Sequence, residues 1–380
     1  MELEFNPNIK IGVLGGGQLG RMLIQEAINF NFNLHLLDKA ESPCEKYAAH
    51  YTRGDILNYS DVYNFGKNLD ILTIEIENVN VKALYDLEKE GIKVYPQPRV
   101  IELIQDKGKQ KEFYTANDFP TSEYYLINSA KEIETHLNHF PFMQKLRKGG
   151  YDGKGVQALK TKEDLTHSFD APSVLEKFVD LDKELSVIVA RTPNKETKCF
   201  PLVEQEFNEE VNLVEFLFSP ANVSETIESI AKNIAKEIIE KLDMIGILAV
   251  EFFLDKSGNL LVNEIAPRPH NSGHQTIEGN YTSQFEQHLR AITNLPLGNT
   301  EIIHPSVMIN LLGEKNEIGP AKYIGIREAI SIQGVTPHLY GKNETKPYRK
   351  MGHVTVINSD LNKAKEIALN LKDSIKIIGK

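Results

Sequence analysis

The stretch Gly246–His274 reads GILAVEFFLDKSGNLLVNEIAPRPHNSGH, and the fold of the chain can be worked out from it. Two apolar runs, Ile247–Leu254 and Leu260–Ile265, are separated by the polar segment Asp255–Asn259. Apolar runs of strand length joined by a short turn that contains glycine are typical of a β-hairpin. We therefore predict a hairpin here, followed by a polar loop.

Two glutamates are expected to face each other across this hairpin. If the turn centres on residues 257–258 and has no bulge, Glu251 lies directly opposite Glu264. Like charges at such cross-strand positions are destabilising, so a compensating cation is needed. Mg²⁺ fits, because it prefers a few carboxylate oxygens together with substrate phosphates. The structural alternative is that Arg268 or Arg290 neutralises a buried carboxylate pair.

The segment that follows the hairpin favours a binding site. Pro267–His274 is a polar loop, stiffened by two prolines and placed directly after a strand end. Binding groups concentrate on loops of this kind because a rigid sheet positions them.

These motifs together resemble a known family. Val250–Phe253 followed by Asn263–Arg268 is similar to the metal-binding hairpin of the ATP-grasp superfamily. The continuation Pro269–His274 resembles the narrower family of 5-(carboxyamino)imidazole ribonucleotide synthetases of purine biosynthesis. The second motif is the more specific of the two, because the first is shared by the whole superfamily.

The resemblance implies an α/β and α+β chain with the ATP-grasp fold. An N-terminal Rossmann-like domain with an open parallel sheet is expected at residues 1–105. The ATP-grasp domain is expected at 106–297, with a lid subdomain at about 119–177, and a small β-rich C-terminal domain at 298–380. Arg99–Ala116 is predicted to be helical.

Composition limits the classes of function. The chain has 380 residues, of which 41% are hydrophobic and 25% charged, as in globular enzymes. Its net charge of −10 disfavours a nucleic-acid partner, because such binding depends on neutralising many phosphates. Two cysteines, Cys44 and Cys199, define no disulfide framework. The start of the chain has no apolar signal region and no run reaches 18 apolar residues, so we expect a cytoplasmic protein without membrane contact.

The glycine-rich segment Gly15–Gly20 comes between a short apolar strand and a helical pattern. Backbone N–H groups at a helix N-terminus favour a phosphate, so the segment predicts a phosphate site. Taken alone it also fits a nicotinamide dinucleotide, with Asp38 as the acid that binds the ribose. The family resemblance instead places the phosphate of the acceptor near Gln18 and Leu19.

A second glycine-rich segment, Gly149–Gly155, holds four glycines among seven residues. Such a loop contributes little to a core, and its amides can approach phosphates closely. The alternative is a plain hairpin turn. The resemblance identifies the segment as the lid of the ATP site.

The resemblance implies the following roles. The catalytic residues would be Lys145, Arg268, His270 and His274, with the metal on Glu251 and Glu264. ATP would bind Lys107, Lys145, Gly150, Tyr151, Asp152, Gly153, Lys154, Gly155, Glu176, Lys177, Phe178, Val179, Glu184, Asn263 and Glu264. The substrate would bind Gln18, Leu19, Glu75, Asn78, Tyr151, Asp152, Lys154, His270, Asn271, Ser272, Lys342 and Arg349. Lys107 stands where the family has arginine, and no ATP contact is predicted at Phe207.

The implied reaction is the ATP-dependent carboxylation of aminoimidazole ribonucleotide by bicarbonate. ATP phosphorylates bicarbonate to carboxyphosphate, and the carboxyl group, or CO₂ released from it, is captured by the exocyclic amine. Mg²⁺, or Mn²⁺ in its place, is the expected cofactor, and a homodimer is the family's expected assembly. His270 and His274 would move protons or hold the carboxyl group. The two alternatives are another ATP-grasp carboxylase or ligase and an NAD-dependent oxidoreductase.

Overall fold

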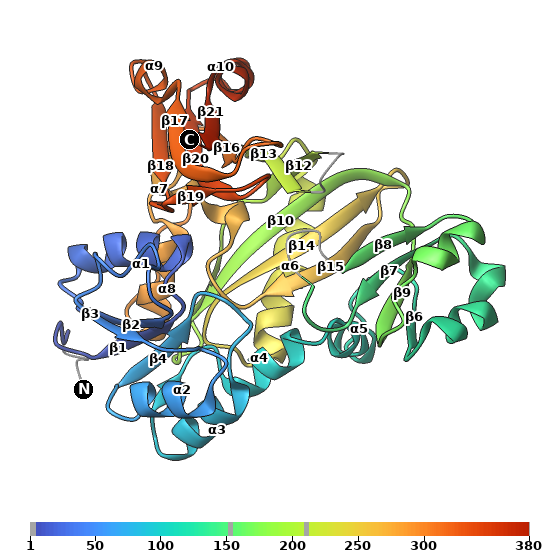
Figure 1. The fold of residues 1–380 in the computed structure, drawn as a ribbon, viewed down its shortest axis with the longest axis horizontal. Coiled ribbons are helices and arrows are strands. Elements are labelled where there is room, and N and C mark those ends of the chain that lie inside the picture. The colour runs from blue at the N-terminus through green and yellow to red at the C-terminus, as the bar shows by residue number, and fades with distance from the viewer. Residues whose placement is uncertain (1–4, 151–154, 209–212, 380) are drawn as a thin grey trace.

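The N-terminal part of the chain is an open sheet of five parallel strands in the order β3-β2-β1-β4-β5 (Figure 1). The computed structural model describes residues 5–150, 155–208 and 213–379. The five strands are β1 (Ile11–Leu14), β2 (Leu34–Asp38), β3 (His50–Arg53), β4 (Ile71–Ile74) and β5 (Lys93–Val94). The helices between them are α1 (Gln18–Asn29), α2 (Tyr59–Gly66) and α3 (Val81–Lys89).

Helices cover both faces of this sheet. Successive residues of a strand point to opposite faces, and β1 follows this rule. Val13 belongs to the same buried cluster as Leu23 of α1, whereas Leu14 belongs to the cluster that contains Leu84 of α3. The predicted Rossmann-like sheet is therefore present.

The helical segment predicted at 99–116 is divided into two helices, α4 (Pro98–Ile104) and α5 (Lys107–Ala116). The reason is Asp106, whose carboxylate accepts hydrogen bonds from the backbone N–H groups of Gly108 and Lys109. A side chain that caps backbone amides in this way begins a new helix. Arg147 holds the same carboxylate through bonds of 2.8 and 2.9 Å. Lys107 consequently occupies the first turn of α5.

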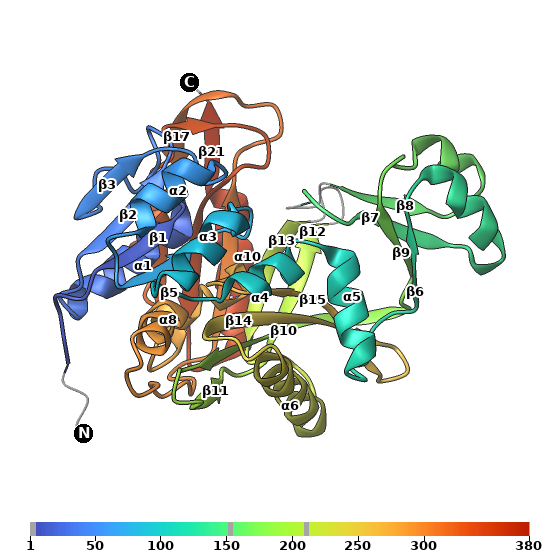
Figure 2. The same cartoon turned by 90° about the horizontal axis from the view of Figure 1, so that it is seen from below.

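A small antiparallel sheet with the order β6-β9-β7-β8 projects away from the rest of the molecule (Figures 1 and 2). Its strands are β6 (Tyr124–Ile127), β7 (Phe142–Leu146), β8 (Val156–Leu159) and β9 (Ser173–Lys177). Two 3₁₀ helices, at Ala130–His139 and Glu163–His167, connect them. This α+β unit corresponds to the region predicted as the lid subdomain.

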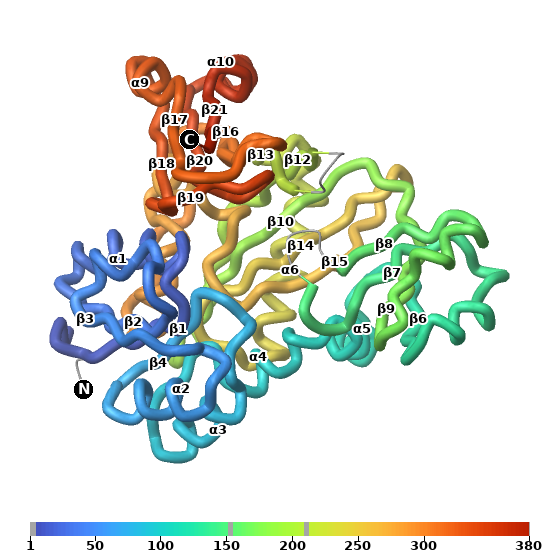
Figure 3. The backbone as a smooth tube through the Cα atoms, viewed as in Figure 1, coloured from blue at the N-terminus to red at the C-terminus, as the bar shows by residue number. Residues whose placement is uncertain are grey.

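The largest sheet runs through the centre of the molecule and continues into the C-terminal part (Figure 3). Its order is β15-β14-β10-β12-β13-β16-β20-β18, and β11 also pairs with β10. The strands are β10 (Leu181–Arg191), β11 (Thr197–Cys199), β12 (Val203–Asn208), β13 (Leu213–Ser219), β14 (Gly246–Asp255), β15 (Leu260–Ala266), β16 (Ser306–Leu312), β18 (Val335–Leu339) and β20 (Lys350–Ile357). Because β13 pairs with β16, the sheet crosses the predicted boundary after residue 297.

Helices pack on both faces of the central sheet. α6 (Glu225–Lys241) buries Ala235 and Ile238 against Leu248 and Val250 of β14. Ile247 and Ala249 of β14 belong instead to the cluster that contains Ala291. That residue lies in α8 (Gln284–Ile292), which follows the short helix α7 (Thr276–Gly279). Odd-numbered residues of β14 therefore face away from α6.

The C-terminal part adds a three-stranded sheet, β19-β17-β21, and two helices. The elements are β17 (Gly319–Ile324), α9 (Ile326–Ala329), β19 (Glu344–Thr345), α10 (Leu361–Ser374) and β21 (Lys376–Gly379). Within the described ranges, no helix has the length and apolar character needed to cross a membrane.

Acid should destabilise the fold through His288, which joins α8 to β4. Its Nε2 lies 2.9 Å from Oγ1 of Thr73, and burial lowers the pKa of His288 to about 3. An unfolded histidine has a pKa of about 6.5, so the unfolded chain binds the extra proton as pH falls below that value. Stability present above pH 6.5 is then lost at about 1.4 kcal/mol per pH unit between pH 6.5 and 3.

Chemical denaturation at pH 7, 6 and 5 measures this dependence. His288→Gln should remove about 1.4 kcal/mol per pH unit from the slope, whereas the same change at the exposed His304 should leave the slope as it is. Equal slopes in the wild type and His288→Gln would contradict the assignment.

Candidate active site

A cavity of about 340 Å³ lies between the small antiparallel sheet and the central sheet, and its wall also includes Lys107 of α5. It brings together most of the residues predicted for ATP and the metal. The predicted residues in its wall are Lys107, Lys145, Gly150, Glu176, Lys177, Phe178, Val179, Glu184, Glu251, Asn263, Glu264, His270 and Asn271.

The wall also contains residues that were not predicted. They are Met143, Val156, Leu181, Phe207, Leu213, Val214, Phe253 and Lys350. All but Lys350 are apolar, as expected for a slot that takes a flat base. Two could have been found from strand alternation, since Met143 lies two residues before Lys145 and Phe253 two residues after Glu251. Lys350 comes from β20, and strand pairing over a long sequence separation brings it here.

The facing glutamates are present, but the hairpin is not built as predicted. Glu251 pairs with Glu264, whereas Phe252 pairs with Val262, so Asn263 is an extra residue in a β-bulge. The prediction of an unbulged turn was therefore wrong. The bulge leaves Val262 in the core and turns both Asn263 and Glu264 towards the cavity.

The negative charges of Glu251 and Glu264 are only partly balanced by nearby cations. Burial, together with the charges of Glu264 and Glu184, raises the pKa of Glu251. Lys107 contacts Glu264 and lowers the pKa of that carboxyl group. Burial also raises the pKa of Glu184 to about 7. Glu251, Glu264 and Glu184 thus all belong to the cavity wall, and Lys107 contacts one of them, Glu264.

The alternative in which Arg268 or Arg290 neutralises Glu251 and Glu264 is not supported. Arg268 pairs with Glu77 at 2.8 Å, and Arg290 pairs with Glu286 at 2.6 Å. Among the described residues, no cluster of three or more histidine, cysteine or acidic side chains could hold a metal by itself. Two carboxylates with room beside them fit Mg²⁺, which commonly completes its coordination with waters and substrate phosphates.

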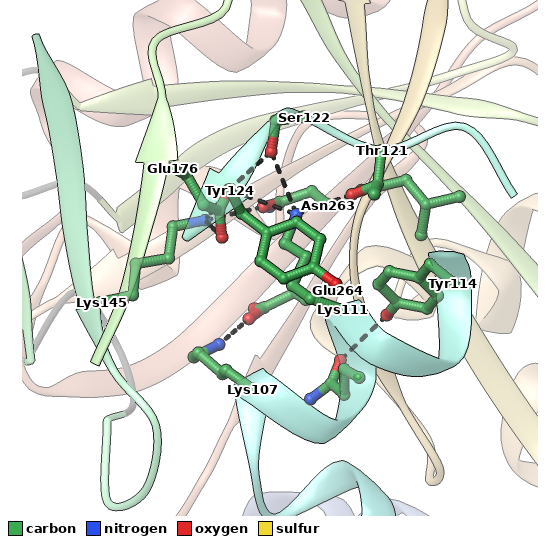
Figure 4. Close-up of polar contacts among 12 residues, drawn as sticks. Lys107, Lys111, Tyr114, Thr121, Ser122, Tyr124, Lys145, Glu176, Asn263 and Glu264 are labelled. Carbon is green, nitrogen blue, oxygen red and sulfur yellow. Dashed lines mark hydrogen bonds and ion pairs between the residues drawn. The ribbon is translucent and has the colours of Figure 1, made fainter. Parts of the chain in front are cut away.

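Lys145 is held beside this pair by a buried network (Figure 4). Its ammonium group lies 3.1 Å from Glu176 and donates a 3.0 Å hydrogen bond to Asn263. Burial acts to raise the pKa of Glu176, but Lys145 and Lys111 outweigh burial and lower that pKa to about 2. The Glu176 side chain therefore stays charged and paired with the two lysines. Any contact of Glu176 with adenine would have to come from its backbone.

The two predicted histidines differ in their surroundings. The backbone N–H of Ser272 donates to Nδ1 of His270, so the neutral ring carries its proton on Nε2, which lies 3.7 Å from Glu251. His274 is 1% exposed, and Nε2 of Gln284 donates to its Nδ1. Burial, helped by His270, lowers the pKa of His274 well below its usual value. His270 borders the cavity, whereas His274 is a neutral part of the core.

Other residues of the same loop support His270. The hydroxyl of Ser272 lies 2.9 Å from Nδ1 of His270 and 2.8 Å from the hydroxyl of Ser186, and both serines are buried. Asn271 exchanges two side-chain hydrogen bonds with Asn310. Ser272, predicted to bind substrate, therefore lies behind His270.

The predicted phosphate loop is largely occupied by carboxylates. The backbone N–H of Gly16 donates to Asp38 at 2.9 Å, and those of Gly17 and Gly20 donate to Glu75 at 2.9 and 2.7 Å. The loop as a whole is thus not open to a phosphate, because these three amides already have anionic partners. Only the first helical amides, at Gln18 and Leu19, match the place that the resemblance indicated. The ribose role of Asp38 loses its support for the same reason.

The residues after β4 also differ from the prediction. The pattern of residues 71–77 predicts one strand with Glu75 and Glu77 on the same face, but β4 ends at Ile74 and residues 75–77 bend. Burial raises the pKa of Glu75, although the amides of Gly20 and Gly17 act against it. Asn78 is exposed, and Arg268 lies outside the cavity wall, paired with Glu77.

The C-terminal segment that carries the predicted cations approaches the start of α1 at Leu339 and Gly341. A guanidinium nitrogen of Arg21 donates to the carbonyl oxygen of Leu339. Arg21 also lies close to Gly341, because a Cβ atom added to that glycine would be 3.3 Å from the guanidinium group. The ammonium group of Lys342 donates to the carbonyl of Lys350, and Arg349 donates to that of Glu344. Arg21, which was not predicted, adds a cation at this junction.

Part of the predicted lid lies outside the described residues, namely Tyr151, Asp152, Gly153 and Lys154. Gly150 borders the cavity. Gly155 has a φ of 75°, and its carbonyl accepts a 2.8 Å hydrogen bond from the amide of Leu146. The glycine is suited to that position because the left-handed region disfavours other residues.

Comparisons with known proteins agree with this architecture. Three family descriptions match the chain: "Ribonucleotide synthetase preATP-grasp domain" at residues 8–105, "ATP-grasp domain" at 112–285 and "Phosphoribosylaminoimidazole carboxylase C-terminal domain" at 306–367. The N5-carboxyaminoimidazole ribonucleotide synthase of Synechococcus elongatus is 35% identical over 364 residues, covering 93% of this chain and 91% of that protein.

The chain belongs to the N5-carboxyaminoimidazole ribonucleotide synthase family. The crystal structure of the Thermotoga maritima synthetase of this family superposes with a TM-score of 0.91 at 43% identity, covering 98% of this chain and 100% of that one. The Aspergillus clavatus synthase in complex with ADP and 5-aminoimidazole ribonucleotide has a TM-score of 0.88 at 33% identity, covering 97% and 98%. The predicted family and the ATP-grasp fold are thereby confirmed.

Membership of this synthase family also agrees with the predicted function in purine biosynthesis. The chain spans only 64–65% of the length of the first plant and fungal relatives that it matches, which are named phosphoribosylaminoimidazole carboxylases. The alternative of an NAD-dependent oxidoreductase is weakened by two findings. Carboxylates occupy the amides of the Gly15–Gly20 loop, and the relatives reported above are synthases.

Proposed function

We propose that this chain carboxylates the amine of 5-aminoimidazole ribonucleotide with bicarbonate, at the expense of ATP and through carboxyphosphate. The observation that carries the proposal is the cavity in which Glu251 and Glu264 face each other beside Lys145 and His270. The proposed reaction is the one for which the synthase family is named. The structure of the Aspergillus relative contains ADP and 5-aminoimidazole ribonucleotide, which supports a nucleotide and this acceptor as the ligands.

In the first step, an oxygen of bicarbonate bonds to the γ-phosphorus of ATP and ADP leaves. Phosphoryl transfer spreads negative charge over the transferring oxygens, so positioned cations do most of the work. Lys107 contacts Glu264, and Lys145 donates to the neighbouring Asn263, so both of these cations of the cavity wall lie beside the carboxylate pair. Mg²⁺ held by Glu251 and Glu264 would neutralise phosphate charge there.

In the second step, the amine nitrogen bonds to the carboxyl carbon, phosphate leaves and the amine loses a proton. His270 is placed to hold the carboxyl group or to carry a proton, because its Nε2 borders the cavity beside Glu251. The apolar wall around Phe178 and Phe253 would take the adenine base, with Glu184 on the ribose. Exclusion of water by the glycine lid would protect carboxyphosphate from hydrolysis.

The acceptor is proposed to bind where α1, the end of β4 and the C-terminal cations meet. Gln18, Leu19, Lys342 and Arg349 would contact its phosphate, and Arg21 adds positive charge at the same junction. Division at residues 105 and 297 into three domains remains part of the proposal. So do the use of Mg²⁺ or Mn²⁺ and assembly as a homodimer, which light scattering of the purified chain would test.

The proposed function is tested by phosphate release from ATP and Mg²⁺. Release should be rapid only when bicarbonate and 5-aminoimidazole ribonucleotide are both present, and omission of either should lower it strongly. The dephosphorylated nucleoside should be a poor acceptor. Phosphate release that is indifferent to 5-aminoimidazole ribonucleotide would favour another ATP-grasp carboxylase or ligase.

A further inference from the structure

Lys111 is a buried cation for which the proposed reaction has no direct use. It lies on α5, one turn after Lys107, and its side chain is only 2% exposed. Its ammonium group donates to the hydroxyls of Thr121 at 2.7 Å and Ser122 at 3.1 Å, and lies 3.3 Å from Glu176. An ammonium group has three donors, and here each has an acceptor.

Glu176 is shared between two lysines. Its carboxylate accepts from Ser122 at 2.9 Å and is in contact with both Lys111 and Lys145 (Figure 4). The side chains of Lys111 and Glu176 are 2% and 4% exposed, whereas that of Lys145 is 13% exposed and reaches the cavity. The group of three carries one net positive charge, and Lys145 is the member that presents it.

We propose that Lys111 is a positioning residue that keeps Lys145 available to the phosphates of ATP by occupying Glu176. Without Lys111, Glu176 and Lys145 would form an exclusive pair with no net charge. Inside a protein such a pair is strongly held, because the local dielectric constant is low. The phosphates would then meet a neutralised lysine.

Lys111 does not itself reach the cavity, since it is absent from the wall and Glu176 and Asn263 lie on that side of the network. Its influence must therefore pass through Glu176. The inference rests on the proposed function only in taking Lys145 as an ATP-binding residue, and nucleotide binding can be measured without bicarbonate or the acceptor.

The test is a double-mutant cycle read by the Kd for ATP in the presence of Mg²⁺. Lys111→Met removes one positive charge, and the Kd should rise about tenfold, an effect typical of removing one charge-assisted hydrogen bond. Adding Glu176→Gln restores the net charge of the wild-type group, so the double variant should recover most of the affinity. The KM for 5-aminoimidazole ribonucleotide should change little in either variant.

Lys109→Met is the matched control, because Lys109 lies on the same helix but is exposed and pairs with Glu102. It should leave the Kd for ATP unchanged. Thermal unfolding of each variant shows whether the fold is retained. A Lys111→Met protein that is folded and binds ATP like the wild type would overturn the proposal. A double variant no better than Lys111→Met would also overturn it, because Lys111 would then not act through Glu176.

The result is independent of the carboxylation itself. If the wild type binds ATP but releases no phosphate with bicarbonate and 5-aminoimidazole ribonucleotide, the proposed function fails. The cycle of ATP affinities still decides the role of Lys111 in that case.

Discussion

Glu264→Gln should lower kcat about 100-fold or more, because a hydrogen bond to a charged group contributes about 1.5–3 kcal/mol and the proposed Mg²⁺ would be lost in addition to the contact with Lys107. Glu264 is one of two facing carboxylates, and a neutral amide would serve a divalent cation poorly. The fold should survive, since the change also removes the charge of Glu264, which adds to burial in raising the pKa of Glu251. Steady-state kinetics over a range of Mg²⁺ concentrations measures the effect.

Glu206→Gln is a suitable control for this variant. Glu206 is exposed and lies on β12, outside the cavity wall. Its replacement should leave both kcat and the Mg²⁺ dependence as in the wild type. An unchanged Mg²⁺ dependence in Glu264→Gln would remove the metal assignment.

The two histidines of the loop after β15 should respond in opposite ways. His270→Asn should lower kcat about 100-fold, within the range for general acid–base groups, while the Kd for ATP stays near the wild-type value. His274→Asn should keep kcat within about threefold but lower the free energy of unfolding by about 1–3 kcal/mol. The reason is that His270 borders the cavity, whereas His274 packs against Phe285 and His353.

Single-turnover phosphate release and chemical denaturation of both variants separate these effects. If the turnover of His274→Asn falls as far as that of His270→Asn while both remain equally stable, the distinction between a cavity residue and a core residue fails. Normal turnover in His270→Asn would remove that residue from the site.

The pairing of Glu251 with Glu264 could be predicted from sequence because both lie on strands joined by a short turn. The bulge at Asn263 could not be predicted. One inserted residue changes which side chains of a strand point to each face of the sheet, and the sequence carries no clear signal of it. Local spacing predicted the correct pair, although the assumed turn was wrong. The lid residues from Tyr151 to Lys154 remain untested.

The glycine loop shows where local patterns mislead. Gly15–Gly20 has the spacing of a phosphate loop, but Asp38 and Glu75 reach its amides from the ends of β2 and β4, the two strands that flank β1. Those bonds depend on contacts over 22 to 58 residues, which no short motif contains. The end of β4 was mispredicted for the same reason, because Glu75 turns towards the loop.

The burial of the charged side chains Lys111 and Glu176 could not be predicted from the sequence either. Glu176 was placed in the ATP site by resemblance, and the structure adds that its side chain joins Lys111 to Lys145. A lysine on a helix is usually solvated, so nothing in the local sequence indicates that Lys111 is enclosed. Lys350 was not predicted as a cavity residue, because cations that stand close together in a sequence, as Lys346, Arg349 and Lys350 do, usually belong to a solvated surface.

The central claim is that bicarbonate is phosphorylated in the cavity before its carboxyl group reaches the amine. The direct measurement uses bicarbonate labelled with ¹⁸O and follows the label by mass spectrometry of the released phosphate. Transfer through carboxyphosphate leaves one bicarbonate oxygen on phosphorus, because the carbon–oxygen bond breaks in the second step. We expect phosphate that carries one ¹⁸O when ATP and 5-aminoimidazole ribonucleotide are present. Product formation with unlabelled phosphate would contradict the account.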